Sequence, residues 1–157
     1  MYDFEHMDKR LIIYANTFLV ANRLQTVMDA ELEEVTSKQW LAIIMLGAFE
    51  EPPTLKQMAQ MCSASHQNTK QIMLKLHQKG YVNMVKDEKD GRAMRIIPLA
   101  KIQELSAKYE ERSKRFIEEM FSDLTEEEIA VMCKAQFKLY DRLEQISRAS
   151  SKSSEKE

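Results

Sequence analysis

The segment from residue 65 to residue 75 gathers polar side chains that can form directional hydrogen bonds with a ligand. Ser65 can cap a helix, and the apolar spacing after it predicts a buried face of Thr69, Ile72, Met73 and Leu76. The opposite face then carries His66, Gln67, Asn68, Lys70, Gln71, Leu74 and Lys75. Asn and Gln can form two hydrogen bonds with a base edge in the major groove of DNA, and Lys can bind guanine or phosphate. This face therefore has the chemistry of a nucleic-acid reader.

Charge is distributed unevenly along the chain, although the formal net charge is only −2. Residues 54–101 carry nine Lys or Arg and three Asp or Glu, whereas the flanking residues 1–53 and 102–157 are both net acidic. No acidic residue occurs from Thr54 to Lys86. A basic segment between acidic ones indicates a local site for a polyanion, although a chance surface patch would look the same. The cations expected to displace counterions from phosphates are Lys56, Lys70, Lys75, Lys79, Lys86 and Arg92.

Other chemistry finds little support in the sequence. Cys62, His66 and His77 could be imagined as metal ligands, but zinc sites have tighter paired spacing, so neither a metal nor a cofactor is expected. There is no Gly-rich phosphate loop, nucleophile signature or pair of metal-binding carboxylates, and an enzyme is not expected. The apolar runs are too short for a membrane span, and the amino terminus is unlike a signal peptide. The expected location is the cytoplasm.

Helix-starting signals place the elements that would position the polar face. A helix is expected over residues 8–29, and capping boxes at 36–39, 54–57 and 125–128 each predict the start of another helix. The helix after the first box is expected to bury Trp40, Ile43, Ile44 and Leu46. The short helix after the second box ends near Cys62 in a tight turn at residues 63–64, and Gly80 ends the helix that follows.

Beyond Gly80 the helical spacing of the apolar residues ends, and short runs typical of β-strands begin. Residues 81–85 and 92–97 predict two short strands joined by a polar connection, and residues 99–121 predict a long helix. The last helix is expected to hold Cys133 on its apolar side, and the serine-rich tail from residue 148 to residue 157 is expected to be disordered. This order predicts a mainly α protein with a small β-hairpin wing, in which dimerisation helices flank a winged helix-turn-helix.

Residues 54–99 resemble the core of the MarR family of transcriptional regulators. The resemblance lies in the Met58-Ala59 pair, Ser65 at the cap, the buried face of the second helix, Lys79-Gly80-Tyr81-Val82 and the wing signature Asp87-x-x-Asp90-x-Arg92. Helices before and after extend it over residues 8–147. Two features depart from the family: Pro98-Leu99-Ala100-Lys101 follows the second wing strand, and Gln71 replaces a basic residue.

The resemblance implies roles for individual residues. Arg92 would enter the minor groove, and Asp90 would orient it. The complete set expected to bind DNA is Lys56, Ser65, His66, Gln67, Asn68, Lys70, Gln71, Lys75, Asp90 and Arg92. An effector pocket is predicted with Tyr14, Phe18, Trp40 and Phe116 as lining residues, and core packing is the alternative for all four.

The resemblance also implies how the protein would work. Residues 1–35 would form an amino-terminal dimerisation helix, residues 36–98 the DNA-binding domain and residues 99–147 the carboxy-terminal dimerisation helices. A homodimer would repress transcription from a pseudo-palindromic operator of double-stranded DNA and would leave it when a small aromatic effector binds. The alternative is a winged-helix module that binds proteins and not DNA.

Overall fold

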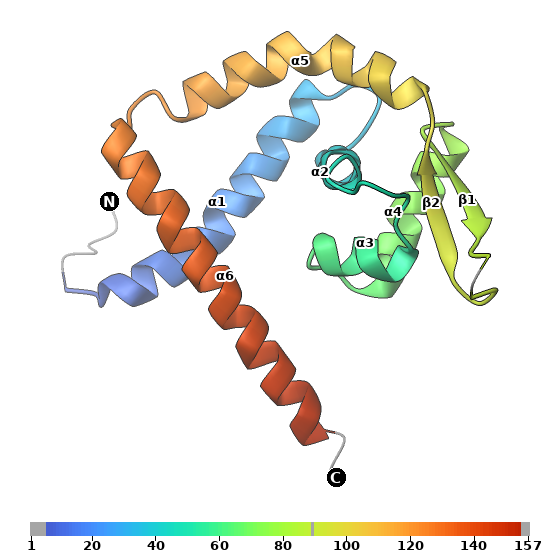
Figure 1. Ribbon diagram of the computed structural model, residues 1–157. Coiled ribbons are helices and arrows are strands. Elements are labelled where there is room, and N and C mark those ends of the chain that lie inside the picture. Colours follow the sequence, from blue (N-terminus) through green and yellow to red (C-terminus); the bar gives the residue numbers. More distant parts are fainter. Residues whose placement is uncertain (1–5, 89, 155–157) are drawn as a thin grey trace. The chain divides into compact units, whose positions relative to one another are not determined.

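A computed structural model describes residues 6–88 and 90–154, with side chains as far as residue 150. The elements are α1 (Lys9–Glu31), α2 (Ser37–Leu46), α3 (Leu55–Met61), α4 (His66–Gln78), β1 (Val82–Lys86), β2 (Met94–Pro98), α5 (Lys101–Met120) and α6 (Glu126–Ser154) (Figure 1). Contacts divide the chain into two units, residues 1–106 and residues 107–157, with α5 beginning in the first. The mainly α fold with one hairpin is thus confirmed.

Side-chain caps fix where the helices begin. The Thr36 hydroxyl accepts a hydrogen bond from the Gln39 amide at 3.3 Å, while the Gln39 side chain accepts one from the Thr36 amide at 3.2 Å. The same reciprocal pair joins Thr54 to Gln57 at the start of α3, and Thr125 to Glu128 before α6. Each box satisfies two amide donors that have no partner inside the helix. All three predicted capping boxes are therefore confirmed.

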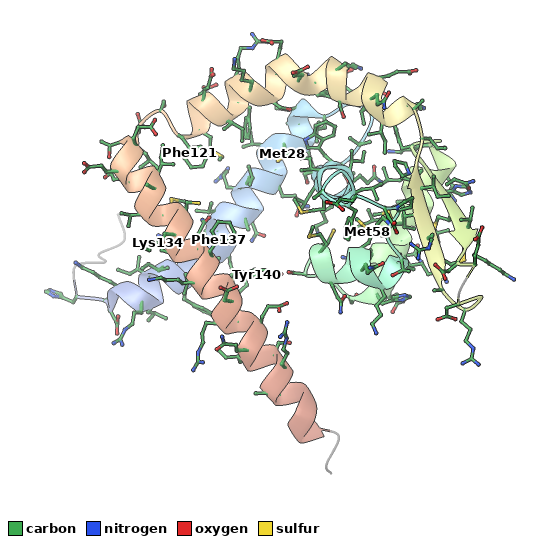
Figure 2. All side chains as sticks on the ribbon, viewed as in Figure 1. Met28, Met58, Phe121, Lys134, Phe137 and Tyr140 are labelled. Atoms are coloured by element: carbon green, nitrogen blue, oxygen red, sulfur yellow. The ribbon has the colours of Figure 1, made fainter. Side chains whose placement is uncertain are left out.

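The core of the first unit lies among α2, α3, α4 and the hairpin. Its most deeply buried side chains include Met58 of α3, labelled in Figure 2, and Met73 and Leu76 of α4. Val82 and Ile96 complete it from the two strands. Because α4 is buried along one face only, its other face is available to solvent.

The hairpin pairs β1 with β2 in antiparallel register, from Val82 opposite Pro98 to Lys86 opposite Met94. A third, very short segment covers the other edge of β2: Thr54 bridges to Arg95, and the Ile96 amide donates to the Pro53 carbonyl at 2.9 Å. Both edges of β2 therefore have backbone partners, so the hairpin is joined directly to the segment from which α3 begins.

Several apolar positions differ from the prediction. Ile44 is 49% exposed, since α2 buries Ala42 and Ile43 instead. Ile72 is only half-buried, since α4 buries Thr69, Met73 and Leu76. Cys133 is exposed, whereas it was expected on the apolar side of the last helix, and Cys62 at the end of α3 is half-buried. The helix α6 continues to Ser154, where disorder was expected, since no Gly or Pro interrupts that part of the chain. Residues 155–157 lie outside the described residues.

Candidate nucleic-acid interface

The outer face of α4 presents the predicted polar set to solvent. His66, Gln67, Asn68, Lys70, Gln71 and Lys75 are all exposed, and Leu74 is half-buried. Only the backbone groups of these residues form hydrogen bonds, within α4 and its cap. Among the described residues, no hydrogen bond or ion pair involves any of the six side chains. Their donors and acceptors are therefore available to an external ligand. We refer to these six residues as the reading face.

The start of α4 is fixed by a turn and a cap. Ser63 has a φ of 48°, a left-handed backbone conformation that reverses the chain after α3, and the Ala64 amide donates to the Ala59 carbonyl at 3.0 Å. The Ser65 hydroxyl then accepts from the Asn68 amide at 3.2 Å. The predicted turn and cap are confirmed, and the cap uses an acceptor lone pair of Ser65, leaving its hydroxyl proton to donate to a ligand.

The wing places Arg92 at the connection between its strands. Arg92 is exposed, and its guanidinium has no ion-pair partner among the described residues. The Asp90 carboxylate accepts a hydrogen bond from the Arg92 amide at 3.1 Å, so in this structure it holds the backbone of Arg92 rather than the guanidinium. The side chain can then extend away from the hairpin, as an arginine that enters a minor groove must.

A buried ion pair at the base of the wing was not predicted. The Asp87 carboxylate, with a side chain only 5% exposed, is paired with the Arg95 guanidinium and also accepts from the Asp90 amide at 2.7 Å. Arg95 donates a second hydrogen bond, of 2.6 Å, to the Pro52 carbonyl before α3. Asp87 and Arg95 stand diagonally across the hairpin, a spacing at which opposite charges interact, and this was the signal available in the sequence. The pair links the wing loop to the helix-turn-helix.

The expected phosphate-binding cations divide into two groups. Lys56, Lys70, Lys75 and Lys86 are exposed, as the prediction required. Lys79 is different: its ammonium donates to the Glu34 carbonyl at 2.7 Å and to the Gln39 side-chain oxygen at 3.0 Å. Lys79 is exposed as well, and with two of its three donors used inside the protein it keeps one for a phosphate, so its role as a phosphate-binding cation stays a prediction.

The four predicted effector-binding residues lie in different surroundings. Tyr14 and Phe18 are exposed on α1, with their rings edge to face at 5.3 Å. Trp40 belongs to the core of the first unit at 8% exposed, and Phe116 is half-buried on α5 in the second unit. The pocket itself stays a prediction.

Residues 6–88 and 90–154 contain no group of three or more His, Cys, Asp or Glu side chains arranged to hold a metal ion. Burial raises the pKa of the Cys62 thiol, which disfavours the thiolate that metal ligation needs. In the same part of the chain, no helix combines the length and the apolar character that crossing a bilayer requires.

A helix pair joined by a tight turn and followed by a hairpin defines the winged helix-turn-helix class of fold. The sequence matches no protein-family model and no curated protein. Solved structures match over most of the chain, and the fold is that of MarR-family transcriptional regulators.

Three of these structures show the extent of the similarity. A MarR protein from Peptoclostridium difficile has a TM-score of 0.78 and 21% identity, covering 92% of this chain and 94% of its own. The organohalide-sensing regulator RdhR, bound to 2,4-dichlorophenol, has a TM-score of 0.77 and 18% identity over 90% of this chain and 85% of its own. The S. aureus MepR–DNA complex has a TM-score of 0.75 and 19% identity, covering 83% of this chain and 97% of its own. At these identities, the similarity establishes the fold.

Proposed function

We propose that the chain is a MarR-family transcriptional regulator that binds DNA sequence-specifically as a homodimer and has no enzymatic activity. The observation that carries this proposal is the reading face of α4: six exposed polar side chains, none acidic and none paired with another of the described residues. Beside it, Arg92 is exposed at the end of a hairpin braced by a buried ion pair. MepR, whose fold is similar, has been crystallised with DNA.

The same face argues against the alternative of a protein-binding module. Surfaces that bind proteins are enriched in Tyr, Trp and Phe and depleted of Lys at their centre. The reading face contains two lysines and no aromatic residue other than His66. Amides interspersed with ammonium groups suit base edges and phosphates better than an apolar protein surface.

The proposal of a homodimer is supported by exposed apolar residues in both units. The helix α1 has no buried residue, and Ile13 and Leu19 are 54% and 63% exposed. On α6, Val131 and Leu143 are 69% and 64% exposed, and Phe137, labelled in Figure 2, is 68% exposed. Monomeric proteins seldom leave so many apolar side chains in water. A second copy of the chain would cover both helices and place two reading faces on a pseudo-palindromic operator.

We further propose that the regulator is a repressor located in the cytoplasm, and that a small aromatic molecule releases it from DNA. The exposed ring pair of Tyr14 and Phe18 offers stacking surfaces for such an effector, with Trp40 and Phe116 as the other predicted lining residues. RdhR, of similar fold, was solved with 2,4-dichlorophenol. That phenol is therefore a suitable probe: it should raise the melting temperature of the protein and weaken its binding to DNA.

Binding to DNA should depend steeply on salt. Lys56, Lys70, Lys75, Lys86 and Arg92, doubled in a dimer, would release counterions with a slope of about −0.9 per phosphate neutralised. If between six and all ten cations contact phosphates, affinity should fall by roughly 10³–10⁵ between 50 and 200 mM salt. The measurement is a binding titration against the promoter DNA next to the chain's own gene, at several salt concentrations.

A scrambled DNA of the same length serves as the control. It should show weaker affinity but a similarly steep dependence on salt, since phosphate contacts carry no sequence information. Light scattering at micromolar concentration should report twice the 18.4 kDa mass of one chain. A monomer, or equal and salt-independent affinity for both DNAs, would contradict the proposed function.

A further inference from the structure

The carboxy-terminal end of α4 is held by side chains from elements distant in the sequence. Glu34 lies in the linker between α1 and α2, Gln39 in α2, Lys79 at the end of α4, Tyr81 just before β1, and Lys101 in the first turn of α5. All five belong to the first unit. We call these five residues the α4 joint. Its role is not explained by the reading face, the wing or the core.

Lys79 makes the first connection of the α4 joint. This C-cap residue of α4 donates to the Glu34 carbonyl at 2.7 Å and to the Gln39 side-chain oxygen at 3.0 Å. Gln39 is 4% exposed and also caps α2, so the acceptor is fixed in place before Lys79 reaches it. The end of α4 is therefore bound both to the linker that follows α1 and to the first turn of α2.

Tyr81 makes the second connection. Its side chain is buried, and its hydroxyl donates to the Glu34 carboxylate at 2.8 Å. Its backbone belongs to the same end of α4, since the Tyr81 amide donates to the Leu76 carbonyl at 2.9 Å. A hydrogen bond to a charged acceptor is shorter and stronger than one between neutral groups. Glu34 is therefore bound twice at this end of α4: its carbonyl accepts from Lys79, and its carboxylate accepts from Tyr81.

Lys101 makes the third connection, from α5. Its ammonium donates to the Lys79 carbonyl at 2.9 Å and lies 4.7 Å from the centre of the Tyr81 ring. The Lys101 ammonium thus binds the carboxy-terminal end of α4, where unpaired carbonyls carry partial negative charge. The three connections lead to the linker that follows α1, the start of α2 and the start of α5.

We infer that the residues of the α4 joint are positioning residues that set the orientation of α4 relative to α1 and the first turn of α5, all within the first unit. This inference rests on the proposed function, in which a second copy of the chain covers α1 and α6, and α5 is the helix that connects the DNA-binding unit to α6. In a symmetric dimer, the two α4 helices must meet major grooves one helical turn apart, about 34–36 Å. A change in tilt at one joint is repeated by symmetry at the other, so the α4 joint controls which spacing between half-sites the dimer accepts.

The test uses the full chain and a set of operators that differ only in spacing. An operator is first selected from random DNA with the wild-type protein, and base pairs are then added or removed between its half-sites. Glu34→Ala and Lys79→Met should each reduce the preference for the selected spacing by about two- to thirtyfold, the usual range for residues that couple two parts of a protein. Tyr81→Phe, which removes one hydroxyl, should act in the same direction.

Matched variants separate positioning from loss of charge or of stability. Lys75→Met removes a cation from the same helix outside the α4 joint, and should lower affinity equally at every spacing. Glu34→Gln keeps an acceptor for Tyr81 and should keep the wild-type preference, unlike Glu34→Ala. Melting temperatures identify variants that do not fold, and Tyr81→Phe decides the matter if Lys79→Met is among them.

The two proposals fail differently in this experiment. If the wild-type protein selects no DNA sequence, the proposed function is wrong. If it selects an operator but the folded joint variants weaken binding equally at all spacings, as Lys75→Met should, then the α4 joint does not position α4, and the proposed function stands.

Discussion

Asp87→Ala is expected to lower the free energy of unfolding by about 2–4 kcal/mol and to weaken DNA binding at the same time. Removing one partner of a buried ion pair costs roughly 3–5 kcal/mol, and the 33% exposure of the Arg95 side chain shifts the expectation toward the lower part of that range and slightly beneath it. The change also removes the acceptor of the Asp90 amide. Unfolding in urea, followed by circular dichroism, measures the first effect, and a titration with operator DNA measures the second.

Two further variants show whether the loss comes from the pair. Arg95→Met keeps an unbranched apolar stem but leaves the Asp87 carboxylate buried without its main partner, so it should also destabilise strongly. The double variant Asp87→Ala with Arg95→Met should be destabilised by less than the sum of the two single effects, with a difference of about 0.5–3 kcal/mol, the range for residues in contact. If the two single changes in the free energy of unfolding simply add in the double variant, Asp87 and Arg95 do not stabilise each other.

The same variants test how the wing works. If Asp87 orders the loop that carries Arg92, then Arg92→Ala should cost less DNA affinity in the Asp87→Ala protein than in the wild type. An unchanged cost in both backgrounds would show that Arg92 reaches DNA without help from the buried pair.

Asn68→Ala and Arg92→Ala are expected to weaken DNA binding in two distinguishable ways. Asn68 lies on the reading face, where a bidentate contact with a base is worth about 1–3 kcal/mol of discrimination, so its loss should relax the preference for operator over scrambled DNA. Arg92 contributes charge, so its loss should weaken binding to both DNAs and reduce the salt slope by about one unit per wing. Binding titrations against both DNAs at several salt concentrations provide the measurement.

Neither change should disturb the fold, because both side chains are exposed and make no contact that the core needs. Their unfolding free energies should stay within about 0.5 kcal/mol of the wild type. Asp90→Ala is the milder companion of Arg92→Ala, since it removes only the acceptor of the Arg92 amide. If Arg92→Ala leaves the affinity for both DNAs unchanged, the assignment of the wing is wrong.

Local signals in the sequence predicted much of the fold. The capping boxes at Thr36, Thr54 and Thr125 each involve residues three apart, so a short window contains all the chemistry that starts the helix. Gly80, with a φ of 77°, ends the helix region as expected for a residue without a side chain. The hairpin was predicted to within two residues at each strand end.

Contacts between distant residues could not be predicted in the same way. The hydrogen bonds from Lys79 to Gln39 and from Tyr81 to Glu34 span 40 and 47 residues, so helical periodicity carries no information about them. Lys79 was therefore assigned to phosphate binding from its charge alone. Burial could not be predicted fully from the sequence either. Ile44 and Ile72 both fit an apolar stripe, but only packing against other elements decides which side of the stripe faces the core.

The division of α4 into a packed face and a reading face also bears on how such a protein can change over time. The helix is anchored by Thr69, Met73 and Leu76 inside, by Ser65 at its start and by Lys79 at its end. None of these anchors belongs to the six residues of the reading face. Substitutions there can therefore accumulate with little cost to folding, so a duplicated copy of this chain could acquire a new operator while keeping its scaffold. By the same reasoning, transplanting the reading face alone should be enough to redirect it in the laboratory.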